Sequence, residues 1–395
     1  MNLKGFGEAA SVLGVFTRLG LASFGGPIAH LGYFREEFVA RRKWIGDADY
    51  ADLVALCQFL PGPASSQVGF AIGLRRAGYL GGLAAWTGFT LPSAIAMTLF
   101  AYGAGALHGA VGEGLLHGLK LVAVAVVAQA ALGMARSLAP DPPRATIAAG
   151  ALIAMALLHG ALAQLAVIGA GALAGLALLR PQGGPQSGEL SAPAITRPAA
   201  IAFLLVFLAM LALSFLPASG SLALAGAFYR SGALIFGGGH VMLPLLRAAV
   251  VDPGWVSDSA FLAGYGAAQA APGPLSTFSA FLGATSSVGP GGVAGAALAL
   301  VSIFLPGLLA LMGALPFWDA FRAEPGARSS MAGVNAAVVG LLASALYDPV
   351  WTSTVRGALD FAAAALGFVL LVVWRLPPIV VVLVGALAGV AMAAF

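Results

Sequence analysis

Residues 16–27, Phe-Thr-Arg-Leu-Gly-Leu-Ala-Ser-Phe-Gly-Gly-Pro, recur in altered form as residues 228–239, Phe-Tyr-Arg-Ser-Gly-Ala-Leu-Ile-Phe-Gly-Gly-Gly. Farther along, Gln58-Phe-Leu-Pro-Gly-Pro63 recurs as Gln269-Ala-Ala-Pro-Gly-Pro274. These and later matches lie 211 to 215 residues apart and keep their order, which chance matches in a chain rich in Ala and Gly would not do. The chain therefore contains two diverged copies of one unit.

The composition is that of a membrane protein. Hydrophobic residues make up 60% of the chain and charged residues only 9%, whereas soluble domains carry about 25% charged residues. Apolar stretches that can cross or nearly cross a bilayer recur at 79–102, 116–136, 145–159, 162–179, 199–217, 293–316, 331–347 and 357–374. We therefore expect an all-α integral membrane protein, and we find no cleaved signal peptide.

The helix count predicts that the second copy is inverted. We assign residues 1–180 to the first repeat, 181–198 to a cytoplasmic linker, 199–217 to a connecting transmembrane helix and 218–395 to the second repeat. Each repeat has four apparent spans after two broken segments, and the connecting helix adds one more. An odd helix between two even repeats turns the second repeat upside down.

The basic residues favour this inversion, because Lys and Arg gather in cytoplasmic loops. In an inverted arrangement 14 of the 19 Lys and Arg residues lie on the cytoplasmic side, while Arg247 and Arg356 face outward and Arg18, Arg230 and Lys120 lie at membrane depth. A parallel duplication would divide the basic loops evenly between the two sides. The count assumes that the Pro-Gly-Pro segments, and less certainly the Phe-Gly-Gly segments, re-enter and return to their own side. The arms of the Pro-Gly-Pro segments are too short to cross the whole bilayer, whereas full crossing is the alternative for the Phe-Gly-Gly segments.

Glycine and proline interrupt the helices where transporters commonly bind their substrate. The chain has 54 Gly and 23 Pro, and broken helices in lipid persist only inside protein or beside a watery cavity. A helix that restarts after a break exposes free N–H groups and its positive dipole end, which suits an oxyanion. The alternative is that Gly and Pro only kink packed helices. The predicted substrate site comprises Arg18, Gly25, Gly26, Pro27, Gln58, Pro61, Gly62, Pro63, Ser65, Ser66, Lys120, Arg230, Gly237, Gly238, Gly239, Gln269, Pro272, Gly273, Pro274, Ser276, Thr277 and Asn335.

Two arginines stand out within this set. Arg18 and Arg230 each precede a Phe-Gly-Gly by six residues, and a permanent cation at membrane depth is costly unless it is paired or hydrated. Two guanidinium groups would supply charge and forked donors to a dianion. Alternatively, they pair with Glu8, a helix carbonyl or a lipid phosphate.

Several polar residues keep two interpretations open. Lys120 aligns with Asn335, and Lys120 either joins the anion site or extends to the membrane surface. Gln58 and Gln269 are either ligands or caps of the hairpins. His30 and His240 do not align with each other, and proton coupling competes with plain packing for both.

No enzymatic, metal or cofactor motif is present. The chain has no zinc-ligand spacing, no Gly-x-Ser-x-Gly and no Walker A sequence, and its single cysteine, Cys57, excludes an internal disulfide. The net charge of +4 follows from topology, so no nucleic-acid partner is expected. The alternatives outside transport are a membrane scaffold, which would not need buried arginines, and an intramembrane enzyme, which would need an acid–base set.

The motifs resemble the chromate ion transporter family in its long, two-domain form. The resemblance rests on F-T-R-L-G-L-A-S-F-G-G-P, R-R-K-W-I and Q-F-L-P-G-P-A-S-S-Q in the first copy and on F-G-G-G-H-V-M-L-P-L, A-Q-A-A-P-G-P-L and G-V-N-A-A-V-V-G-L-L in the second. It implies efflux of chromate from the cytoplasm across the inner membrane, driven by the membrane potential, a proton gradient or a counter-anion. Sulfate or another oxyanion is the alternative substrate, and membrane lipid and a second copy in a homodimer are the other partners considered. Ser231 and Gly239 of the second copy align with Leu19 and Pro27 of the first, so the two half-sites differ.

Overall fold

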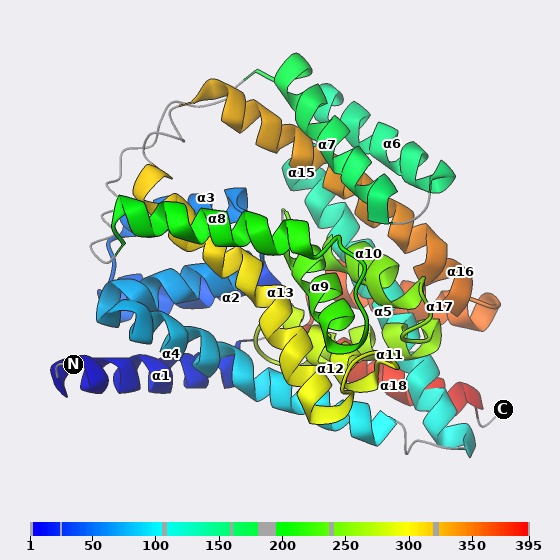
Figure 1. Ribbon diagram of the computed structural model, residues 1–395. Helices are drawn as coiled ribbons and strands as arrows, with labels where there is room; N and C mark the ends of the chain where they lie inside the picture. Colours follow the sequence, from blue (N-terminus) through cyan, green and yellow to red (C-terminus); the bar gives the residue numbers. More distant parts are fainter. Residues whose placement is uncertain are drawn as a thin grey trace.

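The computed structural model describes residues 3–23, 26–104, 109–158, 161–180, 195–236, 241–318 and 324–393. Within these ranges every regular element is helical (Figure 1). Four helices are long and apolar enough to cross a membrane, and shorter apolar helices accompany them. The prediction of an all-helical membrane protein with several spans is confirmed.

The first copy begins with a helix that is interrupted at the Phe-Gly-Gly motif and continues through a π-helical turn. Its elements are α1 (Leu3–Ala22), α2 (Gly26–Phe34), η1 (Arg35–Arg41), α3 (Asp47–Phe59), α4 (Ala64–Ala104), α5 (Gly109–Leu138), α6 (Pro142–Leu157) and α7 (Ala161–Leu178). A connecting helix, α8 (Arg197–Leu213), leads to the second copy.

The second copy repeats this order, including a π-helical turn at the equivalent position. Its elements are α9 (Gly220–Ala233), α10 (Met242–Leu246), η3 (Arg247–Val251), α11 (Asp258–Ala270), η4 (Leu275–Thr277), α12 (Phe278–Thr285), α13 (Gly292–Ala314), η5 (Leu315–Phe317), α15 (Pro325–Ala345), η6 (Leu346–Trp351), α16 (Thr352–Thr354), α17 (Ala358–Val372) and α18 (Pro378–Ala393).

Helix α4 consists of two helices joined by a sharp turn. Ala77 and Gly78 leave the helical conformation, and Gly78 has a positive φ of 63°. The two parts then pack closely, because a Cβ placed on Gly73 would lie only 2.3 Å from the Gly81 carbonyl oxygen. In the second copy Gly283 of α12 meets Gly295 of α13 in the same way, at 2.2 Å. Each Pro-Gly-Pro motif lies between two short helical arms, and we call each such pair of arms a hairpin. The arms are α3 and the first part of α4 in the first copy, and α11 and η4 with α12 in the second.

The last helices of each copy pack against the other copy. In Figure 1, α17 and α18 lie beside α5, while α6 and α7 lie along α15. Glycines make the approach close: a Cβ on Gly118 would lie 2.1 Å from the Gly385 carbonyl oxygen, and one on Gly333 would lie 2.1 Å from that of Gly171. Small residues at crossings allow membrane helices to approach backbone to backbone. The two copies are thus interlocked rather than laid side by side.

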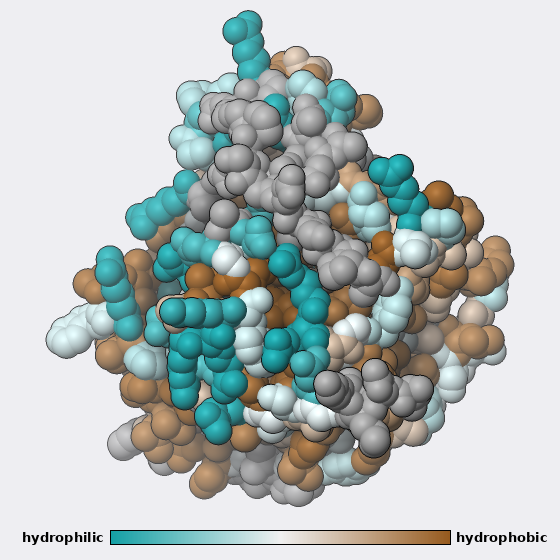
Figure 2. Space-filling view, turned by 90° about the vertical axis from the view of Figure 1, so that its left-hand side faces the viewer, coloured by the Kyte–Doolittle hydropathy of each residue, from teal (hydrophilic) through white to brown (hydrophobic). Residues whose placement is uncertain are grey.

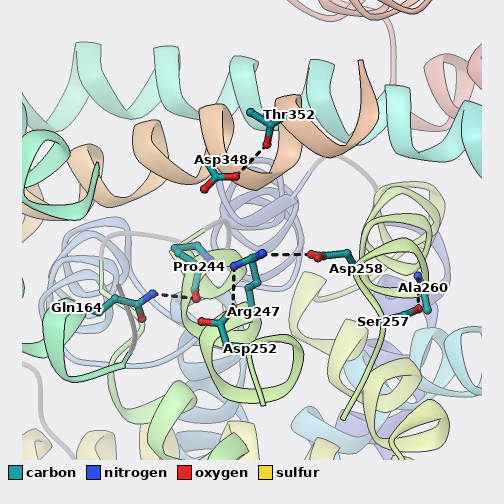
Figure 3. Close-up of polar contacts among 9 residues, drawn as sticks. All are labelled: Gln164, Pro244, Arg247, Asp252, Ser257, Asp258, Ala260, Asp348 and Thr352. Carbon is teal, nitrogen blue, oxygen red and sulfur yellow. Dashed lines mark hydrogen bonds and ion pairs between the residues drawn. The ribbon is translucent and has the colours of Figure 1, made fainter. Parts of the chain in front are cut away.

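An arginine anchors the first arm of each hairpin from the preceding π-helical turn. Arg35 Nε lies 2.8 Å from an Asp47 carboxylate oxygen, and Asp47 is the first residue of α3. Arg247 likewise pairs with Asp258, the first residue of α11, at 3.4 Å, and with Asp252 at 2.8 Å (Figure 3). The equivalent position of the two pairs shows that both copies fix the base of the hairpin in the same manner.

The chain termini and the hydrophilic side chains are placed as follows in the molecule. The N-terminus lies at one end and the C-terminus at the opposite end (Figure 1). Hydrophilic side chains gather over the face that carries the N-terminus (Figure 2).

Candidate functional site

Each Pro-Gly-Pro tip is bound to the helix break of the opposite copy. The Gly62 N–H donates to the Ile235 carbonyl at 2.7 Å, and the Gly273 N–H donates to the Ser23 carbonyl at 2.8 Å. Ser23 and Ile235 are equivalent residues, and each immediately precedes a Phe-Gly-Gly motif. The Pro-Gly-Pro tip of each copy therefore contacts the Phe-Gly-Gly break of the other copy. We call these two contacts the reciprocal crossings.

Only glycine fits at the centre of either tip. Gly62 has a φ of +120° and Gly273 a φ of +89°, conformations that residues with a Cβ rarely adopt. A Cβ on Gly62 would lie 2.7 Å from the Gly307 Cα, and one on Gly273 would lie 2.9 Å from Ser93 Oγ and 3.0 Å from the Phe89 carbonyl oxygen. The neighbouring backbone thus occupies the space that a side chain would need.

Polar side chains satisfy the carbonyls freed at the tips. Gln67 Nε2 donates to the carbonyls of Pro61 at 3.0 Å and Gly307 at 2.8 Å, joining the first tip to α13 of the other copy. In the second copy Thr277 Oγ1 donates to the Pro274 carbonyl at 2.8 Å. Gln67 was not among the predicted site residues, although its position four residues after the second proline of the motif is visible in the sequence.

The first copy also holds buried polar groups with no partner among the described residues. Ser23 Oγ, Ser66 Oγ and Thr90 Oγ1 are buried and lack a hydrogen bond. His30 Nε2 is buried and makes no hydrogen bond of ordinary geometry, although the His30 ring lies within reach of the Ser23 backbone. The other ring nitrogen of His30 lies 3.4 Å from Ser65 Oγ. Sequence reasoning assigned His30 no preferred role and missed Ser23 and Thr90, because a serine or threonine in an apolar helix is usually satisfied by its own backbone.

The structure brings together most of the predicted residues of the two motifs. Gly26 and Pro27 begin α2. Gly25, Gly237, Gly238 and Gly239 lie outside the described residues. The residues that belong to the two tips are Pro61, Gly62, Pro63, Ser65, Ser66, Pro272, Gly273, Pro274, Ser276 and Thr277. Their role in binding stays a prediction.

The two predicted arginines do not share a contact. Arg18 is exposed and makes no ion pair or hydrogen bond with another described residue, and Glu8 pairs with Arg76 instead, at 3.7 Å. Arg230 donates to the Ser214 carbonyl just beyond α8, and its guanidinium carbon lies 5.1 Å from the centre of the Phe215 ring. The described contacts of Arg230 thus match the alternative in which a backbone carbonyl at a helix end accepts a hydrogen bond from its guanidinium group.

Lys120 lines a separate pocket. This pocket of about 510 Å³ also contains His117, Arg356 and Asp360, and His117 Nε2 lies 2.7 Å from an Asp360 carboxylate oxygen. No described residue of the Pro-Gly-Pro tips lines it.

The remaining predicted residues show no shared site. Gln58 is exposed. Gln269 Nε2 and Asn335 Oδ1 are buried atoms without a hydrogen-bond partner among the described residues. No described contact joins these side chains to either tip, so their assignment as ligands or caps stays open.

Known proteins and a family model match this chain along almost its whole length. A family model described as "Chromate transporter" matches residues 10–176 and again residues 222–390. A chromate transport protein of Pseudomonas aeruginosa is 28% identical over 95% of this chain and 90% of its own length. That of Cupriavidus metallidurans is 26% identical over 84% of this chain and 80% of its own length, and an uncharacterized transporter of Methanocaldococcus jannaschii is 25% identical over 96% and 89%. No solved structure matches significantly.

The family model matches each half of the chain separately, in agreement with the two interlocked copies of the structure. Both copies contain the motifs that form the tips. The chain belongs to the chromate transporter family, in the long form that carries the family domain twice.

Proposed function

We propose that this protein is a secondary transporter that exports chromate, a tetrahedral dianion, from the cytoplasm across the inner membrane. The observation that carries the proposal is the pair of reciprocal crossings, in which Gly62 and Gly273 bind the backbone before the opposite Phe-Gly-Gly motif. Unwound backbone at a repeat interface is where secondary transporters of many folds bind substrate. The relatives named for chromate transport support the choice of ion.

The proposed transport cycle follows from the interlocked copies. We infer that the second copy is inverted and that each hairpin enters the membrane and returns to its own side. Two equivalent hairpins then face opposite sides, and exchanging their conformations would open the crossings to one side at a time. The chain has no nucleotide-binding motif, so we infer that the membrane potential, a proton gradient or a counter-anion drives transport.

Transport is tested by the uptake of labelled chromate into inverted membrane vesicles that contain the protein. We expect uptake to depend on an imposed gradient and to exceed that of vesicles from cells without the protein. Unlabelled sulfate serves as the competitor, because sulfate has the same charge and shape as chromate. Preference for sulfate would replace chromate by the second candidate substrate, and no movement of either ion would reject oxyanion transport.

Inversion is tested separately, by labelling single cysteines in a Cys57→Ser background. Arg41→Cys lies in η1, where the arginine side chain is 62% exposed, and Tyr347→Cys lies in η6, where the tyrosine is 70% exposed. We expect a membrane-impermeant maleimide to reach position 347 from outside the cell and position 41 only in inverted vesicles. Labelling of both positions from one side would reject the inverted arrangement.

A further inference from the structure

Four unpartnered polar groups of the first copy are not repeated at the equivalent positions of the second copy. Ser23, His30, Ser66 and Thr90 correspond to Ile235, Met242, Thr277 and Phe304 in the second copy. Three of these four equivalents are apolar, and the fourth, Thr277, is already bonded to the Pro274 carbonyl. The fold is duplicated, but the free polar groups at its centre are not.

A series of contacts links these residues to the crossing of the second-copy tip with the first-copy break. Gly273 bonds the Ser23 carbonyl, and its Cα faces the Phe89 carbonyl and Ser93 Oγ. Ser93 Oγ in turn donates to the Thr90 carbonyl at 3.1 Å. The His30 ring packs edge-on against Phe89 at 5.2 Å, and its Nδ1 lies 3.4 Å from Ser65 Oγ, next to Ser66. We call Ser23, His30, Ser65, Ser66 and Thr90 the first-copy polar cluster.

A buried hydroxyl without a partner destabilises a protein, so each one calls for an explanation. Plain packing does not supply it, because Thr90 sits in a helix where the carbonyl four residues earlier is the usual acceptor, and yet its hydroxyl remains free. A ligand that accepts several hydrogen bonds would satisfy the whole cluster at once. Hydroxyl and imidazole groups can all donate, and none of the five side chains is a carboxylate that would repel an anion.

We propose that the first-copy polar cluster is the binding site for the transported oxyanion and that it holds the ion through neutral donors, in a single asymmetric half of the duplicated fold. The proposal rests on the proposed function and assigns its site. A fully deprotonated tetrahedral dianion, such as sulfate or chromate, offers only acceptors and fits this set.

The test measures binding rather than transport, with radiolabelled sulfate as the probe and the full-length protein in detergent. Thr90→Val keeps the shape of the side chain and removes the free hydroxyl. We expect it to weaken sulfate binding at least tenfold and to leave the melting temperature of the sulfate-free protein unchanged or higher. Ser66→Ala should weaken binding similarly, while Thr90→Ser should stay within about threefold of the unmodified protein.

The matched control is Ser279→Ala, which removes a buried hydroxyl of the second copy that already donates to the Ser276 carbonyl at 2.7 Å. Its sulfate affinity should not change. In competition, chromate should displace the bound sulfate, because the two dianions have the same charge and shape.

Two results would overturn the assignment. One is sulfate affinity within twofold of the unmodified protein in both Thr90→Val and Ser66→Ala. The other is a lower melting temperature in Thr90→Val with unchanged affinity, which is the behaviour of a structural hydroxyl. Both results leave chromate transport by the unmodified protein intact, whereas absence of both binding and transport in the unmodified protein would reject the proposed function itself.

Discussion

Gly62 and Gly273 combine two constraints that are separable by mutation. Each has a positive φ, and each has backbone or a side-chain oxygen within 3.0 Å of the position of a Cβ. The first constraint is local to the residue. The second belongs to the crossing of the two copies, so it should affect transport as well as stability.

We therefore predict that Gly62→Ala destabilises the protein and abolishes chromate transport. A residue with a Cβ at such a φ costs about 1 to 3 kcal/mol, and the contact with Gly307 would push the first tip away from Ile235. The control is Gly254→Ala, because Gly254 has a φ of +78° and open space around its Cβ position. Melting temperature and vesicle uptake are measured together. Gly254→Ala should lose stability but keep transport, and equal transport in both variants would disprove a role for the crossing.

Arg230 provides a second test at the scale of one side chain. Its guanidinium binds the Ser214 carbonyl and packs on Phe215, which are both structural contacts. We predict that Arg230→Gln lowers the melting temperature and the maximal transport rate while the KM for chromate changes less than about twofold. An increase of tenfold or more in KM with an unchanged melting temperature would instead support the sequence-based prediction that Arg230 binds the anion.

Among the elements, α5 shows how the copies hold each other. Gly118 packs on the α18 backbone, whereas Gly133 of the same helix is exposed and has open space at its Cβ position. We predict that Gly118→Ala destabilises the protein by about 1 to 3 kcal/mol through overpacking. Gly133→Ala should be neutral or stabilising by up to about 1 kcal/mol, because alanine favours a helix. The measurement is thermal unfolding in detergent, and equal effects of the two substitutions would contradict the close contact.

The π-helical turn η1 carries a carboxylate whose ionisation should affect stability. Burial alone would raise the pKa of Glu37, but hydrogen bonds and charges from Arg42 and Arg41 outweigh it and hold the pKa below its ordinary value of 4.5. A lowered pKa means that the ion pairs stabilise the fold above that ordinary value and lose their effect as the pH falls through the lowered pKa.

We predict that Glu37→Gln lowers the melting temperature at pH 7 and that the difference from the unmodified protein shrinks below pH about 4.5, near the ordinary pKa of the carboxyl group. Melting temperature is recorded from pH 3 to pH 8 for both proteins. The control, Glu36→Gln, changes the neighbouring exposed carboxylate. A difference for Glu37→Gln that is constant over the whole pH range would contradict the charge-based explanation.

At the scale of the whole molecule, the sequence was sufficient for the class, the duplication and the helix breaks. Hydrophobic runs and repeated motifs are encoded locally, so 293–316 and 331–347 were expected as helices from composition alone. The structure has α13 (Gly292–Ala314) and α15 (Pro325–Ala345) there. The crossing partners were not predictable, since neither Gly62 nor Gly273 specifies by itself which carbonyl it will meet. The assignment of Lys120, Arg18 and Arg230 to one site depended on helix rotation and packing, which local sequence does not determine. The first-copy polar cluster was equally hidden, because its members are ordinary polar residues until their partners prove to be missing.

The interlocking of the copies also constrains how the protein is made. Gly118 finds its partner only in Gly385, 267 residues later in the chain. While the second half is still on the ribosome, the glycine-lined side of α5 must remain covered by lipid or by an assembly factor. The first half alone should therefore be a poor independent unit, prone to degradation when translation stops early. Helix α18, which contains Gly385, would then join α5 at a late stage of membrane assembly.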